Sequence, residues 1–203
     1  MISRIVLASN NKGKLAELQA MFAPLGIALV PQGELGVPEA EEPHRTFVEN
    51  ALAKARHAAR AAGGAAIADD SGLCVDALGG APGVLSARYA TLFGGPRDDD
   101  SNNDALLRQL GDAADRRARF VSALVALRSA DDPEPLIAFG RWEGEVLASR
   151  RGQGGFGYDP LMFVPSLGQT VAELSPELKN RHSHRAIAAR QMQVLMREVW
   201  HLG

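Results

Sequence analysis

Residues 65–90 read AAIADDSGLCVDALGGAPGVLSARYA, and the fold can be inferred outward from this stretch. Its apolar start predicts a buried strand that ends at the adjacent carboxylates Asp69 and Asp70. Because side chains alternate between the two faces of a strand, these carboxylates are expected to point in different directions. Only one of them would then face a given site. The alternative is a polar turn with a local cap, which is common for Asp-Ser-Gly runs.

A second small-residue loop, Gly79–Gly83, follows a short predicted strand at Leu73–Val75. Glycine lets a backbone approach a ligand closely, so two such loops around one short strand favour a ligand site over a plain turn. In such a site, one carboxylate could bind a divalent cation or take a proton from water, while basic or backbone partners hold the other.

Composition predicts an ordinary globular protein. With 203 residues, 46% hydrophobic and 23% charged, the chain is long enough for one core, and we expect a single domain over residues 1–203. The formal net charge of -2 provides no field to recruit nucleic acid or an anionic membrane. We find neither an apolar run near the roughly 20 residues of a spanning helix nor a secretory signal, which favours a cytoplasmic protein. The single cysteine, Cys74, excludes an intrachain disulfide and a thiolate metal cage.

The N-terminal segment predicts a strand at Ile5–Ala8, a polar loop, and then a helix. The loop residues Ser9–Asn11 can cap that helix, but Lys12 and Lys14 place positive charge at its positive end. This arrangement suits a bound phosphate. A solvated lysine pair on a surface turn is an equally good interpretation of these residues alone.

Three further segments have mainly structural interpretations. Thr46 and Glu49 form a capping box for a helix that runs to Ala61 or Ala62, and a glutamate just before it, Glu41 or Glu42, could still ligate a metal. The acidic triplet Asp98–Asp100 is typical of a helix N-terminus. A hairpin is predicted from two strand-like runs, Arg119–Leu127 and Leu136–Trp142.

The third glycine-rich loop, Gln153–Pro160, carries two aromatic residues and a carboxylate. Aromatic rings on a glycine-bent backbone suit a planar ligand, although a tight turn with both rings in the core is at least as common. Farther along, Ser175 and Pro176 begin a helix, and basic residues follow that could bind phosphate or a base.

Taken in order, five motifs resemble those of the inosine triphosphate pyrophosphatase family, including its bacterial members that act on dITP and XTP. These motifs are Ser9–Glu17, Thr46–Ala51, Asp69–Tyr89, Gly154–Pro160 and Ser183–Arg185, which cover nearly the whole chain. The resemblance implies an α/β fold with an elongated mixed sheet, flanking helices and two lobes around a central nucleotide cleft. It also implies a homodimer that hydrolyses ITP, dITP and XTP to the monophosphate and pyrophosphate with Mg²⁺.

The resemblance also implies roles for individual residues. Asp70 would be the catalytic proton acceptor and, with Glu42 or less favourably Glu41, a ligand of Mg²⁺. The base would be read by His184 and Arg185 and lined by the aromatic loop. The substrate-binding residues implied in this way are Ser9, Asn10, Asn11, Lys12, Gly13, Lys14, Ser71, Phe156, Gly157, Tyr158, Asp159, Lys179, His184 and Arg185.

The sequence departs from the family pattern at two places. It has Pro43-His44 where the family often has Thr-Gly, and it has His182 where the family usually has an apolar residue. Two rival functions also stay open. A metal-dependent phosphatase with Asp69 or Asp70 as nucleophile would release orthophosphate. A non-catalytic nucleotide-binding module would bind ITP without turnover.

Overall fold

The computed structural model describes residues 2–202. Its strands are β1 (Arg4–Leu7), β2 (Ala28–Pro31), β3 (Ala66–Val75), β4 (Arg117–Leu127), β5 (Leu136–Val146), β6 (Met162–Val164) and β7 (Gln169–Thr170). Its α-helices are α1 (Lys12–Phe22), α2 (Phe47–Ala62), α3 (Asp99–Leu110), α4 (Pro176–His182) and α5 (His184–Trp200). Short 3-10 helices occupy Ala23–Leu25, Gln32–Leu35, Asp76–Leu78, Gly83–Phe93 and Val171–Glu173.

The strands form one mixed sheet in the order β2-β1-β3-β4-β5-β6-β7. β1 is parallel to both β2 and β3, whereas β6 is antiparallel to β5 and β7. Parallel neighbours need a crossover connection, and α1 and α2 provide it in this chain. The predicted α/β fold with a mixed sheet and flanking helices is therefore confirmed.

The chain divides into two compact units, and three strands contribute to both. Among the described residues, unit 1 comprises 2–70, 122–140 and 184–202, and unit 2 comprises 71–121 and 141–183. The boundaries fall within β3, β4 and β5.

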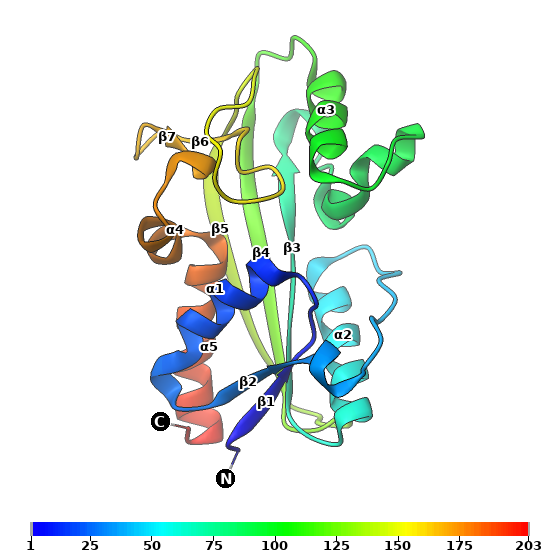
Figure 1. Ribbon diagram of the computed structural model, residues 1–203, viewed down its shortest axis with the longest axis vertical. Coiled ribbons are helices and arrows are strands. Elements are labelled where there is room, and N and C mark those ends of the chain that lie inside the picture. Colours follow the sequence, from blue (N-terminus) through cyan, green and yellow to red (C-terminus); the bar gives the residue numbers. More distant parts are fainter. Residues whose placement is uncertain (1, 203) are drawn as a thin grey trace. The chain divides into compact units, whose positions relative to one another are not determined.

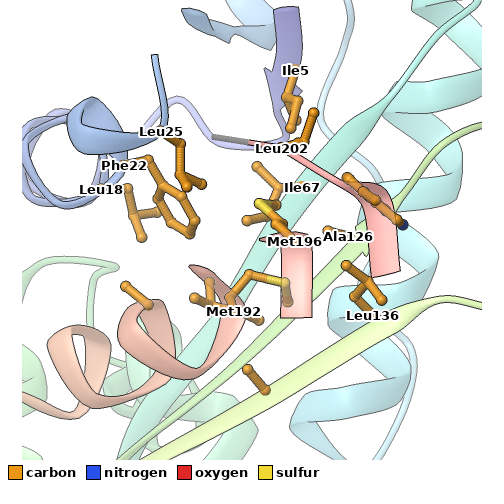
Figure 2. Close-up of a cluster of buried hydrophobic side chains, with 14 of the residues drawn as sticks. Ile5, Leu18, Phe22, Leu25, Ile67, Ala126, Leu136, Met192, Met196 and Leu202 are labelled. Atoms are coloured by element: carbon orange, nitrogen blue, oxygen red, sulfur yellow. The ribbon is translucent and has the colours of Figure 1, made fainter. Parts of the chain in front are cut away.

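One face of the unit 1 sheet is covered by α1 and α5, which lie side by side (Figure 1). Figure 2 shows Leu18 and Phe22 of α1 pointing toward Met192 and Met196 of α5, all fully buried. Gly140 in β5 permits the close approach of α5, since a Cβ there would lie 1.8 Å from the His184 carbonyl oxygen. This packing fixes the start of α5, where His184 and Arg185 lie.

The opposite face of the unit 1 strands packs against α2. The helix begins after Thr46, whose hydroxyl accepts the Glu49 N–H, and ends at Gly63 with φ of 64°, so the predicted cap is confirmed. Ala51, Ala55 and Ala58 recur at helical spacing and pack against Val6 and Ala68 of the strands. Small side chains let α2 lie close to the sheet, which brings its polar residues within reach of β3.

The predicted end of the strand at Asp69 is wrong, because β3 continues through both aspartates to Val75. The polar residues do not form a turn, since long-range partners satisfy both carboxylates inside the sheet. Gly72 is also not a turn residue. A Cβ at this position would lie 2.4 Å from the Gly83 carbonyl oxygen, so the glycine lets the segment 79–83 pack directly beside the strand.

Unit 2 has a core of its own, built from Leu106, Trp142, Tyr158, Leu161 and other buried residues. Its helix α3 begins after Asp98, whose carboxylate accepts the Ser101 N–H at 2.7 Å, as the acidic triplet predicts.

No helix within residues 2–202 is long and apolar enough to cross a membrane.

Candidate functional site

The N-terminus of α1 carries the first group of predicted site residues. Asn11 is the cap, and its side chain accepts the Lys14 N–H at 3.0 Å, while Ser9 Oγ accepts the Asn11 N–H at 3.2 Å. The first turn of the helix contains no acidic residue, so its positive end is not neutralised within the helix. Asn10 donates from Nδ2 to Glu39, whereas Lys12 is exposed at the surface.

Asp69 is the centre of a buried ionic cluster in unit 1. Its Oδ2 lies 2.9 Å from Lys14 Nζ and accepts a bond from Arg185 Nε at 3.2 Å, and its Oδ1 accepts the Ser122 hydroxyl at 2.6 Å. Arg185 also pairs with Glu17 of α1. The cluster joins residues from α1, β3, β4 and α5.

The surroundings of Asp69 shift two pKa values in the same direction. Burial alone would raise the pKa of the Asp69 carboxyl, but Lys14, Arg185 and the Ser122 hydroxyl hold it well below its ordinary value. Burial lowers the pKa of Lys14, and the neighbouring cations Arg185 and Lys54 lower it further. The attraction of Asp69 raises this pKa but does not outweigh them. Asp69 is therefore a fixed anion that positions Lys14 and is a poor proton acceptor.

Asp70 lies on the other face of β3, against α2. Lys54 Nζ lies 2.9 Å from Asp70 Oδ1 and 2.8 Å from Glu42 Oε1, and it also donates to the Asp69 carbonyl oxygen at 2.9 Å. Asn50 Nδ2 approaches Asp70 Oδ2 at 3.4 Å. The predicted divergence of the two aspartates is confirmed, because they contact different helices.

The Asp70 site is electrostatically distinct from that of Asp69. Burial raises the pKa of Asp70 above its ordinary value, and the attraction of Lys54 only partly opposes this. For Lys54, burial would lower the pKa, but Asp70 and Glu42 together raise it. Asp70 is the better proton acceptor of the two carboxylates, because its conjugate acid is weaker.

Glu42 and Asp70 also fit a hard divalent cation. One oxygen of each contacts the same Lys54 ammonium, so the two carboxylates lie close enough to share a cation. Within residues 2–202 no group of three or more His, Cys, Asp or Glu side chains could hold a metal ion. Two carboxylates are nevertheless enough for a hard divalent cation that takes its other ligands from water or a bound anion. Glu41 is exposed.

The aromatic glycine loop of unit 2 is held together by Asp159. Its Oδ2 accepts the Phe156 N–H at 3.0 Å and lies 2.7 Å from Lys179 Nζ of α4. The same ammonium lies 4.5 Å from the centre of the Phe156 ring. A Cβ at Gly155 would lie 2.1 Å from Asp159 Oδ2, so glycine is required for this turn.

A pocket of about 270 Å³ lies beside this loop within unit 2. Its walls include Phe156 and Gly157, together with Asn103 of α3 and Arg150. Tyr158 belongs to the core of the unit instead, where its hydroxyl donates to the Ser86 carbonyl oxygen at 2.9 Å. Phe156 is thus the ring of this loop that borders a pocket.

The remaining predicted residues lie where the chain passes from one unit to the other. Ser71 is half-buried at the start of unit 2, directly after Asp70. His184 and Arg185 are buried in the first turn of α5 in unit 1, and Arg185 contacts Asp69 and Glu17. The helix predicted to begin at Ser175 and Pro176 is α4, which ends at His182, and a separate helix, α5, begins at His184.

Sequence analysis did not include Lys54 among the candidate site residues. A usable signal was present. Asn50 and Lys54 are four residues apart and therefore lie on the same side of the helix, beside the buried alanines Ala51 and Ala55. A lysine next to an apolar helical stripe needs a buried anion, which here is Asp70.

Comparisons with known proteins agree on one family. A family model described as "Ham1 family" matches residues 5–195. The "dITP/XTP pyrophosphatase" of Leptothrix cholodnii is 64% identical, with 98% of this chain and 100% of the relative covered. The "dITP/XTP pyrophosphatase" of Methylibium petroleiphilum is 66% identical, with 97% of this chain and 99% of the relative covered. The solved structure of a HAM1 protein from Coxiella burnetii is 47% identical, with a TM-score of 0.89 and coverage of 97% and 99%.

Proposed function

Because the chain belongs to the Ham1 family, we propose that it hydrolyses the non-standard purine nucleoside triphosphates ITP, dITP and XTP to the monophosphate and pyrophosphate. The relatives from Leptothrix cholodnii and Methylibium petroleiphilum are dITP/XTP pyrophosphatases at more than 60% identity. The single observation that carries the proposal within this structure is that Asp69 and Asp70 belong to different ionic clusters on the two faces of β3. These surroundings lower the pKa of Asp69 and raise the pKa of Asp70. One carboxylate is held as a fixed anion, and the other is prepared to accept a proton.

The phosphates would bind at the N-terminus of α1. Backbone N–H groups and the helix dipole favour an anion there, and Lys14 supplies a cation whose position is set by Asp69. Ser9, Asn10, Asn11, Lys12 and Gly13 belong to the same turn and would add hydrogen bonds. Lys54 is a second cation beside Asp70 and would stabilise charge that develops on the phosphates.

Glu42 and Asp70 would hold Mg²⁺ together with the substrate phosphates. When bound, the cation neutralises phosphate charge and makes a nearby water more acidic. Asp70 would accept the proton of the attacking water at its carboxylate, and Asn50 keeps Oδ2 oriented. The water oxygen forms a bond to the α-phosphorus as the bond from that phosphorus to the bridging oxygen breaks, and pyrophosphate leaves.

The base would be recognised by the aromatic loop of unit 2 and by the Ser183–Arg185 segment. Phe156 offers a ring for stacking, and Gly157, Tyr158, Asp159 and Lys179 shape the loop around it. His184 and Arg185 would read the 6-oxo group of the purine. A donor left unpaired against the 6-amino group of adenine costs about 1 to 3 kcal/mol, which would favour ITP over ATP.

We further propose that the protein is a cytoplasmic homodimer that binds neither nucleic acid nor membrane. The family resemblance supports the homodimer. The net charge of -2 supports the lack of polyanionic partners.

The test is a panel of nucleoside triphosphates assayed for released pyrophosphate with Mg²⁺ present. We expect pyrophosphate from ITP, dITP and XTP and much less from ATP, with loss of turnover after chelation. Release of orthophosphate would support a phosphatase that uses an aspartate nucleophile. Binding of ITP without any product would indicate a non-catalytic nucleotide-binding module.

A further inference from the structure

The N-terminal half of α3 is hydrogen-bonded to the aromatic glycine loop at both the N–H and the carbonyl group of Gly157. Asp99 Oδ2 accepts the Gly157 N–H at 2.7 Å, and Asn103 Nδ2 donates to the Gly157 carbonyl oxygen at 2.9 Å. Asn103 Nδ2 also donates to the Asp99 carbonyl oxygen at 2.7 Å. The two polar backbone atoms of Gly157 are therefore held by two side chains from one helix.

These bonds connect residues that are far apart in sequence and are not needed to cap α3. Asp98 already caps the helix, since its carboxylate accepts the Ser101 N–H at 2.7 Å and the Ser101 hydroxyl at 3.0 Å. Helix capping therefore leaves the contacts of Asp99 and Asn103 unexplained. Asn103 is only 2% exposed, and its contacts bring the loop against the helix.

Gly157 is the residue through which the helix can control the aromatic ring. It follows Phe156 directly and has φ of 60°, a conformation that side chains of other residues rarely permit. The peptide that joins Phe156 to Gly157 carries the N–H bonded by Asp99. Rotation of this peptide would move the Phe156 ring, which borders the pocket and contacts Lys179.

We propose that Asp99 and Asn103 are positioning residues that hold the Phe156 ring in the orientation required to stack on a purine base. The inference rests on the proposed function, because it assigns the recognition of the base to this loop. Loss of either side chain should weaken binding of the base and lower discrimination between purines. The phosphate-binding residues of unit 1 should be unaffected.

The experiment compares Asp99→Ala, Asp99→Asn and a charge control, Asp112→Asn, in the full-length protein. Asp112 is an exposed aspartate just beyond the end of α3. For each variant we measure kcat and KM with dITP and dATP, inhibition by inorganic tripolyphosphate, and the thermal unfolding midpoint. Tripolyphosphate inhibition reports on the phosphate site, and the unfolding midpoint reports on the stability of the fold. A change in KM without a change in either one is therefore specific to the base site.

For Asp99→Ala we expect KM for dITP to rise about tenfold, which corresponds to the loss of one charge-assisted hydrogen bond. Its kcat should change much less, and its preference for dITP over dATP should fall. Inhibition by tripolyphosphate and the unfolding midpoint should stay at wild-type values. Asp99→Asn should restore most of the affinity, because an amide oxygen can still accept the Gly157 N–H, and Asp112→Asn should match the wild type.

A parallel variant, Asn103→Ala, should show the same rise in KM, and its unfolding midpoint is measured because the residue is buried. If it does not fold, Asp99→Ala decides alone. Wild-type KM and wild-type preference in Asp99→Ala would overturn the inference, as would an equal loss of tripolyphosphate inhibition. A wild-type protein that releases no pyrophosphate from dITP would instead overturn the proposed function, and this inference with it.

Discussion

Asp69 and Asp70 are adjacent in sequence, yet their carboxylates belong to different ionic clusters. The alternation of side chains along β3 sends Asp69 to Lys14 and Arg185 and sends Asp70 to Lys54. The sequence predicts this divergence from strand geometry alone. It does not predict the partners, because they come from helices that are distant in the chain.

Asp70→Asn should abolish most turnover while nucleotide binding persists. The amide keeps the size of the side chain but cannot accept the proton of the attacking water. A positioned general base contributes typically about 10² to 10⁴-fold, so we expect kcat to fall by that range. Pyrophosphate release gives kcat, and calorimetric titration with ITP gives the affinity. Near-wild-type turnover would rule out Asp70 as the base.

Asp69→Ala should mainly destabilise the protein. The side chain of Asp69 is fully buried, and its removal leaves Lys14 without its anion, which for a broken buried ion pair costs roughly 3 to 5 kcal/mol. Urea denaturation measures the change in the free energy of unfolding. Adding Lys14→Met to Asp69→Ala should recover part of the loss, because no buried charge is then left unpaired. Strictly additive losses in the double variant would contradict the assigned pairing.

At the scale of elements, the connection between β4 and β5 depends on one carboxylate. Asp132 Oδ2 accepts the Arg128 N–H and Nε–H, both at 2.9 Å, and Oδ1 accepts the Glu134 N–H at 3.1 Å. The hydrogen bond from the Arg128 side chain holds the pKa of Asp132 below its ordinary value, although its burial acts in the opposite direction. The hairpin predicted from sequence thus has a specific anchor.

Asp132→Ala should lower the free energy of unfolding by roughly 1 to 3 kcal/mol at pH 7, since the partly buried hydrogen bonds from Arg128 and Glu134 lose their acceptor. A carboxylate with a lowered pKa stabilises the fold above its unfolded pKa, and this contribution disappears as the pH falls through the folded value. The difference between variant and wild type should therefore shrink below about pH 4. Asp131→Ala is the control, because that neighbouring side chain is 95% exposed. A difference that grows with acidity would contradict the assignment.

Local signals in the sequence predict the element starts well. The caps at Thr46, Asp98 and Ser175 are confirmed, because capping involves residues only two or three positions apart. The continuity of β3 could not be predicted, since the polar run at Asp69 and Asp70 resembles a turn until its distant partners are known. Lys54 was missed for the same reason.

At the scale of the whole molecule, the two units contribute different chemistry. Unit 1 contains the ionic clusters around Asp69 and Asp70, and unit 2 contains the aromatic loop and its pocket. The family resemblance indicates which segments carry function, because it rests on short motifs spread along the chain. It does not reveal the contacts of Asp99 and Asn103 with the loop, because these depend on how α3 packs within unit 2.

The measurement that tests the central claim most directly is hydrolysis of dITP in ¹⁸O-labelled water with Mg²⁺, followed by mass spectrometry of both products. If Asp70 activates water for attack on the α-phosphorus, the label enters the nucleoside monophosphate and the pyrophosphate remains unlabelled. Label in the pyrophosphate, or orthophosphate as the first product, would contradict the account.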